Sequence, residues 1–516
     1  MPSAHSGSQK TRRVVVIGAG IGGLTAGALL ARRGYRVLVL DQALVPGGCA
    51  STFQRRGFTF DVGATQVAGL EPGGIHQRIF DELEIDLPAA TPCDPACAVF
   101  LPNETEPINV WRDPERWQAE RQRQFPCSEP FWQLMATLFQ ASWKFQSRDP
   151  VLPPRNLWDL WQLTSAVRPD TLITLPFTFM TVGDALHRYG LYEDRRLRTF
   201  LDLQLKLYSQ VDADETALLY AATALGVSQE PQGLFHLQGS MQTLSDALVE
   251  AIEKYGGKLL MRHRVERIDL SDGKTLGVTV RNQKTGETWQ ESTDEIVANV
   301  TVQNLVQLLG SQSPPGYKRR VDNLPPASGA FVIYLGVDQS AIPPDCPPHL
   351  QFLYDYNEPI GENNSLFVSV SKPGDGRAPQ GQATIIASSF TNPQLWWQGE
   401  KEEYDRLKQH YTQEAIARLN HYFYLKPETI IHQETATPRT FAHYTGRDRG
   451  IVGGIGQRIP TFGPFGFATR TPIKHLWLVG DSTHPGEGTA GVSYSALTAV
   501  RQIENCSMVE RSRNYG

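Results

Sequence analysis

Glycines at fixed spacing near the start of the chain form the pattern Gly18-Ala19-Gly20-Ile21-Gly22-Gly23. Gly18 permits a tight turn, Gly20 lets the backbone approach a pyrophosphate, and Gly23 lets a helix pack closely on a strand. Asp41 follows about twenty residues later, where a carboxylate accepts hydrogen bonds from ribose hydroxyls and repels a 2′-phosphate. The spacing predicts a site for a dinucleotide with an unphosphorylated ribose, which both FAD and NAD satisfy.

The elements that must hold this motif can be predicted from the flanking residues. Arg13 to Ile17 is rich in β-branched residues, as in a strand covered on both faces. Leu24 to Arg33 is typical of a helix, with Gly34 at its C-cap, and Val37 to Leu40 is a second apolar strand. Together they predict a βαβ unit that presents the glycines at a helix N-terminus.

A second group of glycines and hydroxyls follows this unit, where FAD would extend beyond its pyrophosphate. The segment Pro46-Gly47-Gly48-Cys49-Ala50-Ser51-Thr52 comes directly after the second strand, and Asp61-Val62-Gly63 follows it. NAD is shorter than FAD, so this continuation favours FAD. Its candidate contacts are Gly47, Gly48, Ser51, Thr52 and Gly63.

The C-terminal region carries a third motif. Leu476 to Val479 is a predicted strand that leads into Gly480 and Asp481, and a glycine-rich turn from Pro485 then leads into a helix. Such a turn presents backbone amides to the pyrimidine end of an isoalloxazine, where reduction places negative charge. His484 beside it has two open interpretations, a proton carrier or a packed and hydrogen-bonded side chain, and the second is favoured.

Pro485-Gly486-Glu487-Gly488-Thr489-Ala490-Gly491-Val492-Ser493-Tyr494-Ser495-Ala496 resembles the P-G-x-G-x-x-G-V-x-x-S-A signature of bacterial-type carotenoid desaturases and isomerases. These are glutathione-reductase-type flavoproteins of the amine oxidase and phytoene desaturase superfamily. The resemblance implies that Asp481 binds the ribityl chain and that the backbone of Val265 contacts the adenine side of FAD. Gly239-Ser240-Met241 resembles the family's G-G-M element, with a departure at Ser240. The cofactor residues expected overall are Gly18, Gly20, Gly22, Gly23, Asp41, Gly47, Gly48, Ser51, Thr52, Gly63, Val265, Gly480, Asp481, Gly488, Gly491 and Val492.

The expected fold class is α/β, with a Rossmann-like FAD-binding domain of the glutathione reductase type and an inserted substrate domain of mixed sheet and helices. The FAD-binding domain is predicted to be discontinuous, over residues 1–80, 231–310 and 470–516. Residues 81–230 and 311–469 are predicted to form the substrate-binding, membrane-facing domain. Within the nucleotide domain we expect a helix over Leu244 to Tyr255 and strands over the four segments Lys258 to Met261, Arg264 to Ile268, Gly277 to Arg281 and Glu295 to Val300.

From Asp81 to about Glu230 the sequence is rich in aromatic residues and its segments are typical of helices. Trp132, Trp143, Trp158 and Trp161 lie close together in sequence, which suits a tunnel for a long apolar ligand, although a large hydrophobic core remains the simpler alternative. Leu172 to Met180 is nearly all apolar, and two interpretations stay open, a monotopic membrane contact or a buried helix.

Composition limits the partners. The formal net charge of -5 provides no basic surplus for nucleic acid, and the six cysteines show no spacing typical of disulfides or zinc, so no metal site is expected. Neither a signal peptide nor a transmembrane helix is indicated. The expected location is intracellular, on the cytoplasmic side, with peripheral membrane association.

These observations predict an FAD-dependent oxidoreductase that introduces a C=C bond into an acyclic carotenoid, with closest resemblance to C-3′,4′ desaturases. Hydride transfer from an allylic carbon to the flavin and loss of a neighbouring proton complete the alkene, and no obligatory acid/base pair is evident. The alternatives are a carotenoid cis-trans isomerase that uses reduced FAD, a flavin amine oxidase, and a flavin-binding carotenoid carrier without activity.

Overall fold

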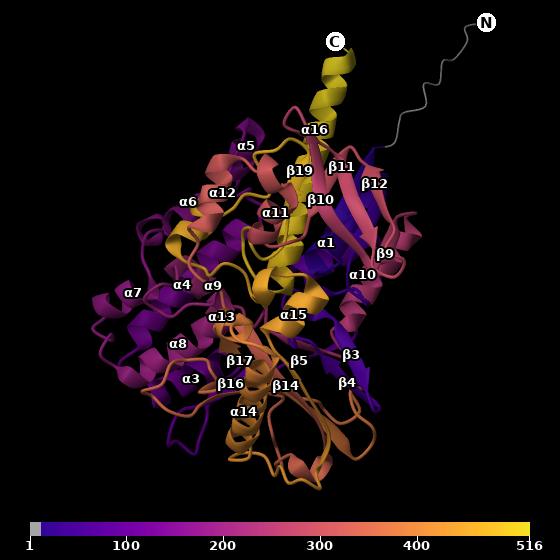
Figure 1. Ribbon diagram of the computed structural model, residues 1–516. Coiled ribbons are helices and arrows are strands. Elements are labelled where there is room, and N and C mark those ends of the chain that lie inside the picture. The colour runs from indigo at the N-terminus through magenta and orange to yellow at the C-terminus, as the bar shows by residue number, and fades with distance from the viewer. Residues whose placement is uncertain (1–11, 516) are drawn as a thin grey trace, which may run out of the picture.

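A five-stranded parallel sheet contains the first and the last strand of the described chain (Figure 1). The computed structural model describes residues 12–515, with side chains to Val509, so the polar arm over residues 1–11 lies outside it. The strand order is β19-β13-β1-β2-β9. The bounds are β1 Arg13–Ile17, β2 Arg36–Asp41, β9 Lys258–Met261, β13 Glu295–Ala298 and β19 Leu476–Leu478.

This sheet is covered on both faces because its strands are apolar on both faces. Val14 and Val16 pack towards α1 (Ile21–Arg32), α10 (Gln242–Lys254) and α16 (Thr489–Tyr515), which cover one side. Val15 and Ile17 point the opposite way, as the period of two in a strand requires. They pack on a three-stranded antiparallel sheet and a helix, formed by β10 His263–Ser271, β11 Lys274–Asn282, β12 Thr288–Ser292 and α11 Val302–Leu309.

A second, seven-stranded sheet lies below the first in Figure 1, in the order β18-β14-β17-β16-β15-β6-β7. All its neighbours are antiparallel except β15 and β6. The helices α13 (Pro393–Trp397) and α14 (Lys401–Leu419) cover one face, while the β3-β4 hairpin and α15 (Pro438–Thr445) cover the other. The strand bounds are β3 Thr52–Arg55, β4 Phe58–Asp61, β6 Cys97–Phe100, β7 Ile108–Val110, β14 Gly329–Asp338, β15 His349–Leu353, β16 Ser365–Val370, β17 Gln382–Thr391 and β18 Ile430–Ala436.

A lobe of helices lies on the left of Figure 1. Its bounds are α3 Pro114–Gln124, α4 Glu129–Gln146, α5 Leu157–Ala166, α6 Pro169–Leu172, α7 Val182–Arg188, α8 Arg195–Ser209 and α9 Leu218–Gly226. The remaining elements are α2 Ile75–Leu83, α12 Pro315–Asp322 and a two-stranded pair, β5 Ala90–Pro92 with β8 Phe235–Leu237. Among the described residues, no helix is long and apolar enough to cross a membrane.

Two sequence expectations need correction. The first helix begins at Ile21 rather than Leu24, because Gly20 is its N-cap and Gly22 and Gly23 lie in its first turn. Leu172 to Met180 is not a buried helix: α6 ends at Leu172, and a 3-10 turn follows over Leu175–Phe177. Four of the apolar side chains of this segment are exposed, namely Leu172, Ile173, Leu175 and Phe179.

Candidate functional site

The first glycine loop lies between β1 and α1, against the end of β2. Asp41 holds it, since Oδ2 accepts a hydrogen bond from the Ala19 amide at 2.6 Å and Oδ1 accepts one from Ala43 at 2.7 Å. Burial raises the pKa of the Asp41 carboxyl, while these two amides act in the opposite direction. The loop amides beside the N-terminus of α1 form a cradle for a pyrophosphate.

The glycines of this loop are packed too tightly for any side chain. A Cβ on Gly23 would lie 2.0 Å from the carbonyl oxygen of Gly18. Cβ atoms on Gly18 and Gly20 would each lie within 3 Å of Asn299, at 2.6 and 2.9 Å. Asn299 follows β13 and donates from Nδ2 to the Gly18 carbonyl at 3.4 Å. Asn299 was not among the predicted site residues, because a single asparagine after a strand carries no distinctive spacing.

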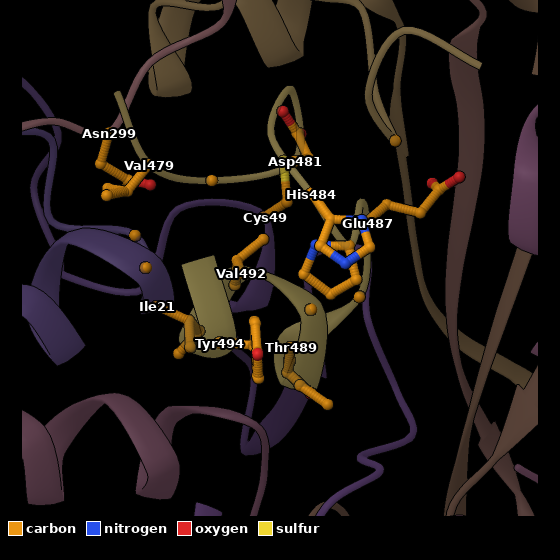
Figure 2. A pocket seen from close by; sticks show the side chains of 18 of the residues that line it. Ile21, Cys49, Asn299, Val479, Asp481, His484, Glu487, Thr489, Val492 and Tyr494 are labelled. Atoms are coloured by element: carbon orange, nitrogen blue, oxygen red, sulfur yellow. The ribbon is translucent and has the colours of Figure 1, made fainter. Parts of the chain in front are cut away.

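Asn299 also reaches the C-terminal motif, so it joins glycines that are far apart in sequence. Gly480 has a left-handed φ of +108°, and a Cβ there would lie 2.9 Å from Oδ1 of Asn299. Figure 2 shows Asn299 and Val479 together at one end of the site, with Ile21 below them. The N-terminal and C-terminal motifs therefore form one continuous surface.

The second glycine group continues this surface. Gly47 donates its amide to the Ala19 carbonyl at 2.7 Å and has a φ of +113°, which favours glycine. Gly48 and Gly63 also line the cavity. The hydroxyls of Ser51 and Thr52 have partners within the protein instead, as Ser51 donates to Gly48 O and Thr52 donates to Asp61 Oδ1.

Asp481 meets a cation that the sequence analysis did not single out. Its Oδ2 accepts a hydrogen bond from Nη2 of Arg447 at 2.6 Å, and both side chains are largely buried. Arg447 also donates from Nε to the carbonyl of Ile451. Asp481 thus lines the cavity as a paired carboxylate.

The loop after Asp481 adds two titratable side chains. His484 lies against Gln146 Oε1, with Nε2 at 3.1 Å, and burial lowers its pKa to about 4, so its ring is neutral near pH 7. Glu487 accepts a hydrogen bond on Oε2 from Gln210 Nε2 at 3.0 Å. The neutral, hydrogen-bonded state of His484 agrees with the packing interpretation.

One cavity of about 1090 Å³ contains these motifs. Its cofactor side is formed by residues of all three glycine motifs together with Asp41, Val265, Asp481 and Val492. Of the expected cofactor residues, Gly23, Ser51 and Thr52 do not line it, since Gly23 lies behind the loop and the two hydroxyls point inwards. The cavity then continues into an apolar part between the helical lobe and the second sheet, lined by Trp143, Phe145, Leu163, Leu175, Leu207, Tyr208, Leu219, Tyr220, Phe367, Phe390, Phe441 and Phe462.

The residues on the cofactor side fit FAD. A carboxylate stands at the end of β2 for the ribose, a glycine loop that excludes side chains leads into a helix, and the cleft continues past that loop for the rest of an extended cofactor. A cleft shaped for NAD would need no glycine-rich wall beyond the pyrophosphate. The donor set and the extended cradle match a flavin dinucleotide.

Comparisons with known proteins agree with this geometry. Residues 16–83 match the NAD(P)-binding Rossmann-like domain model. Prolycopene isomerase 2 of an Oncidium hybrid cultivar is 28% identical over 95% of this chain and 83% of its own. The zeta-carotene-forming phytoene desaturase of Myxococcus xanthus is 25% identical over 96% of this chain and 95% of its own. Cyclohexylamine oxidase of Brevibacterium oxydans has the same fold, with a TM-score of 0.60 at 17% identity over 96% of this chain and 100% of its own.

The fold and the site define an FAD-dependent oxidoreductase with a Rossmann-like cofactor domain. Within that class, the relatives extend over nearly the whole chain rather than over the cofactor domain alone. The chain fits the FAD-dependent carotenoid desaturase and isomerase family.

Proposed function

We propose that this enzyme introduces a C=C bond into an acyclic carotenoid, at C-3′,4′ of an end group. The observation that carries the proposal is the single cavity, in which the cofactor cradle opens directly into an aromatic, apolar chamber. A long apolar ligand gains about 25 cal/mol for each Å² of apolar surface that it buries there. The relatives named as desaturases support the same reaction class.

In this proposal, the amides around Gly18, Gly20 and Gly22 hold the pyrophosphate, and Asp41 accepts from the adenosine ribose. The C-terminal residues Asp481 and Val492 lie along the flavin half. When bound, FAD supplies the two-electron acceptor. The protein orients the polyene and excludes water, because the wall of the chamber is mostly aromatic and apolar.

Expression in cells that make defined acyclic carotenoids tests the proposal, with products resolved by chromatography and mass. A desaturase yields a product two mass units lighter, which absorbs further to the red. Unchanged pigments across lycopene and its hydroxylated derivatives would refute carotenoid desaturation.

Cis-trans isomerisation is the second candidate, and one observation favours it. Four prolycopene isomerases are 26–28% identical to this chain, whereas the named carotenoid desaturases are 24–25% identical. Isomerisation leaves the product mass unchanged and alters only chromatographic retention. The amine oxidases share the fold alone, at 15–17% identity.

A membrane surface is the proposed source of the polyene. An apolar rim of exposed side chains, defined here as Leu157, Leu160, Trp161, Leu172, Ile173, Leu175 and Phe179, lies on α5, α6 and the turn after them. Leu175 belongs to this rim and also lines the cavity, so the rim adjoins the apolar part of the cavity. Exposed Arg155 and Arg168 lie in the same segment, where they would meet anionic lipid headgroups.

Vesicle flotation tests this contact, with vesicles of zwitterionic phospholipid alone and of mixed zwitterionic and anionic phospholipid. We expect Trp161→Asp with Phe179→Asp to abolish flotation, because each aspartate adds a charge to the buried contact. Leu276→Asp is the matched control, since Leu276 is also an exposed apolar residue, at 55%, and belongs to β11 rather than to the rim. Equal flotation of the double variant and the wild type would contradict the assignment.

A further inference from the structure

Glu487 is a carboxyl group at the boundary between the cofactor side and the apolar part of the cavity. It lies in the turn between Asp481 and α16, and it lines the cavity. Figure 2 shows its side chain extending away from Asp481 and His484. In the sequence, Glu487 is only a variable position of the glycine signature.

Only one of the two carboxylate oxygens of Glu487 has a hydrogen-bond partner among the described residues. Oε2 accepts from Gln210 Nε2 at 3.0 Å, while Oε1 is buried and has no hydrogen-bond partner among the described residues. Gln210 is held by the fold rather than by Glu487, because it ends α8 in a left-handed conformation with φ +67°. A buried oxygen without a hydrogen-bond partner costs free energy, so an oxygen of this kind beside a cofactor cleft indicates a functional group.

Each ionisable neighbour of Glu487 already has another partner or is neutral. Arg447 is paired with Asp481 at 2.6 Å. Tyr220 donates its hydroxyl to the Tyr208 carbonyl at 2.5 Å, and burial raises its pKa. His484 is neutral, as described above. Among the described residues, no cation therefore forms an ion pair with Glu487. Burial, followed by the charge of Asp481, raises the pKa of its carboxyl well above the ordinary value.

We propose that Glu487, whose side chain lines the cavity, is the general base of the reaction, and that its carboxylate accepts the proton that the polyene loses. The proposal rests on the desaturase function above. Two C–H bonds of the polyene break: one hydrogen leaves as a hydride to oxidised flavin, and the other leaves as a proton to the carboxylate. One C=C bond forms, the flavin gains two electrons, and Glu487 becomes a neutral carboxylic acid. Gln210 is the positioning residue, since its hydrogen bond to Oε2 fixes the orientation of the carboxylate.

Anaerobic stopped-flow reduction of the FAD-loaded enzyme by polyene, measured from pH 5 to 9, tests this role. A base with a raised pKa must be ionised to act, so the wild-type rate should rise with pH through that pKa. Glu487→Gln should retain FAD, lose this pH dependence and react about 100-fold or more slowly. Glu402→Gln, an exposed position on α14, is the matched control and should behave as the wild type. A Glu487→Gln enzyme with wild-type rate and pH profile would overturn the proposal.

Gln210→Asn supplies a second test, because asparagine tolerates the left-handed backbone but is too short to reach Glu487. The hydrogen bond from Gln210 lowers the pKa of Glu487. Its loss should therefore move the rise of the flavin reduction rate to higher pH. If Gln210 has a merely structural role, the rise of the rate with pH will occur at the same pH in Gln210→Asn as in the wild type. That result would also overturn the proposal.

Proton uptake during chemical reduction of the bound flavin needs no polyene, so it separates this proposal from the proposed function. The added negative charge near Glu487 raises its pKa further. In a series from pH 5 to 9, the wild type and Glu402→Gln should therefore take up an extra proton at those pH values where Glu487 is ionised before reduction, and Glu487→Gln should not. Equal uptake in all three proteins would refute Glu487 as the proton acceptor. If uptake differs as expected but no polyene reduces the wild-type flavin, the desaturase function fails while Glu487 remains the group that takes up the proton.

Discussion

Arg377 is the cation of a buried network that joins distant parts of the chain, and its removal should be costly. Its Nε and Nη2 lie 3.3 and 3.0 Å from Oδ2 of Asp61, and Nη1 lies 3.3 Å from Oδ2 of Asp375. All three side chains are at most 5% exposed. Asp61 also accepts from the Met241 amide at 2.8 Å, so the network links β4, the start of α10 and the turn before β17.

Arg377→Met keeps the volume but leaves two carboxylates buried without their cation. Removing one partner of a buried ion pair lowers the free energy of unfolding by about 3–5 kcal/mol. A chain of this length has an unfolding entropy of about 1 kcal/mol/K if it unfolds as one unit, so the thermal midpoint should fall by about 3–5 °C. Differential scanning calorimetry at pH 7, with FAD content measured in parallel, gives the thermal midpoint and the change in unfolding free energy.

Arg267→Met is the control for loss of an arginine, because Arg267 pairs with Asp269 on β10 with 58% of its side chain exposed. Exposed pairs contribute about 0–1 kcal/mol, so its midpoint should change by about 1 °C or less. Arg377→Lys should fall between the two, since lysine restores the charge without the planar fork. An Arg377→Met midpoint within about 1 °C of the wild type would refute the reasoning about this network.

Three further outcomes follow from the structure. Gly23→Ala should give little folded, FAD-containing protein because its Cβ has no space, whereas Gly316→Ala, with nothing within 4 Å, should match the wild type in yield and flavin absorbance. Asp481→Ala should lower FAD retention after gel filtration, and full occupancy would show that Asp481 does not bind the cofactor. Burial lowers the pKa of His76 from 6.5 to about 4, so the unfolded state binds protons first as pH falls. Stability should therefore drop by about 2 kcal/mol between pH 7 and 5 in urea titrations, and a wild-type slope in His76→Phe would contradict this.

The sequence predicted the cofactor sheet well because its signals are local. β1 begins and ends at the expected residues, Arg13 and Ile17, because a run of β-branched residues before a glycine loop is typical of a buried strand. The return of the chain to this sheet at β13 and β19 was also expected, since each is a short apolar strand beside a motif. The proposed division into two discontinuous domains stays a prediction.

The second sheet was far less predictable. β6 and β7 are short strands, Cys97–Phe100 and Ile108–Val110, inside a stretch that was interpreted as helical. These segments form strands because β6 pairs with β15 and β6 and β7 pair with each other, and no local sequence pattern indicates such pairing. The residues missed at the site, Asn299, Arg447 and Glu487, share this property, because each gains its role from a partner more than thirty positions away.

This dependence on distant partners couples cofactor binding to completion of the fold. Asn299 fills the space between the glycines near residue 18 and Gly480, so neither motif has its final shape until β1, β13 and β19 are side by side. FAD binds only that assembled state, and its binding adds stability in proportion to the logarithm of its concentration over its dissociation constant. The apo-protein should therefore lose its first and last strands together, and the thermal midpoint should rise with added FAD. Because the polyene chamber opens from the same cleft, the substrate meets a complete cavity only after the two ends of the chain have joined.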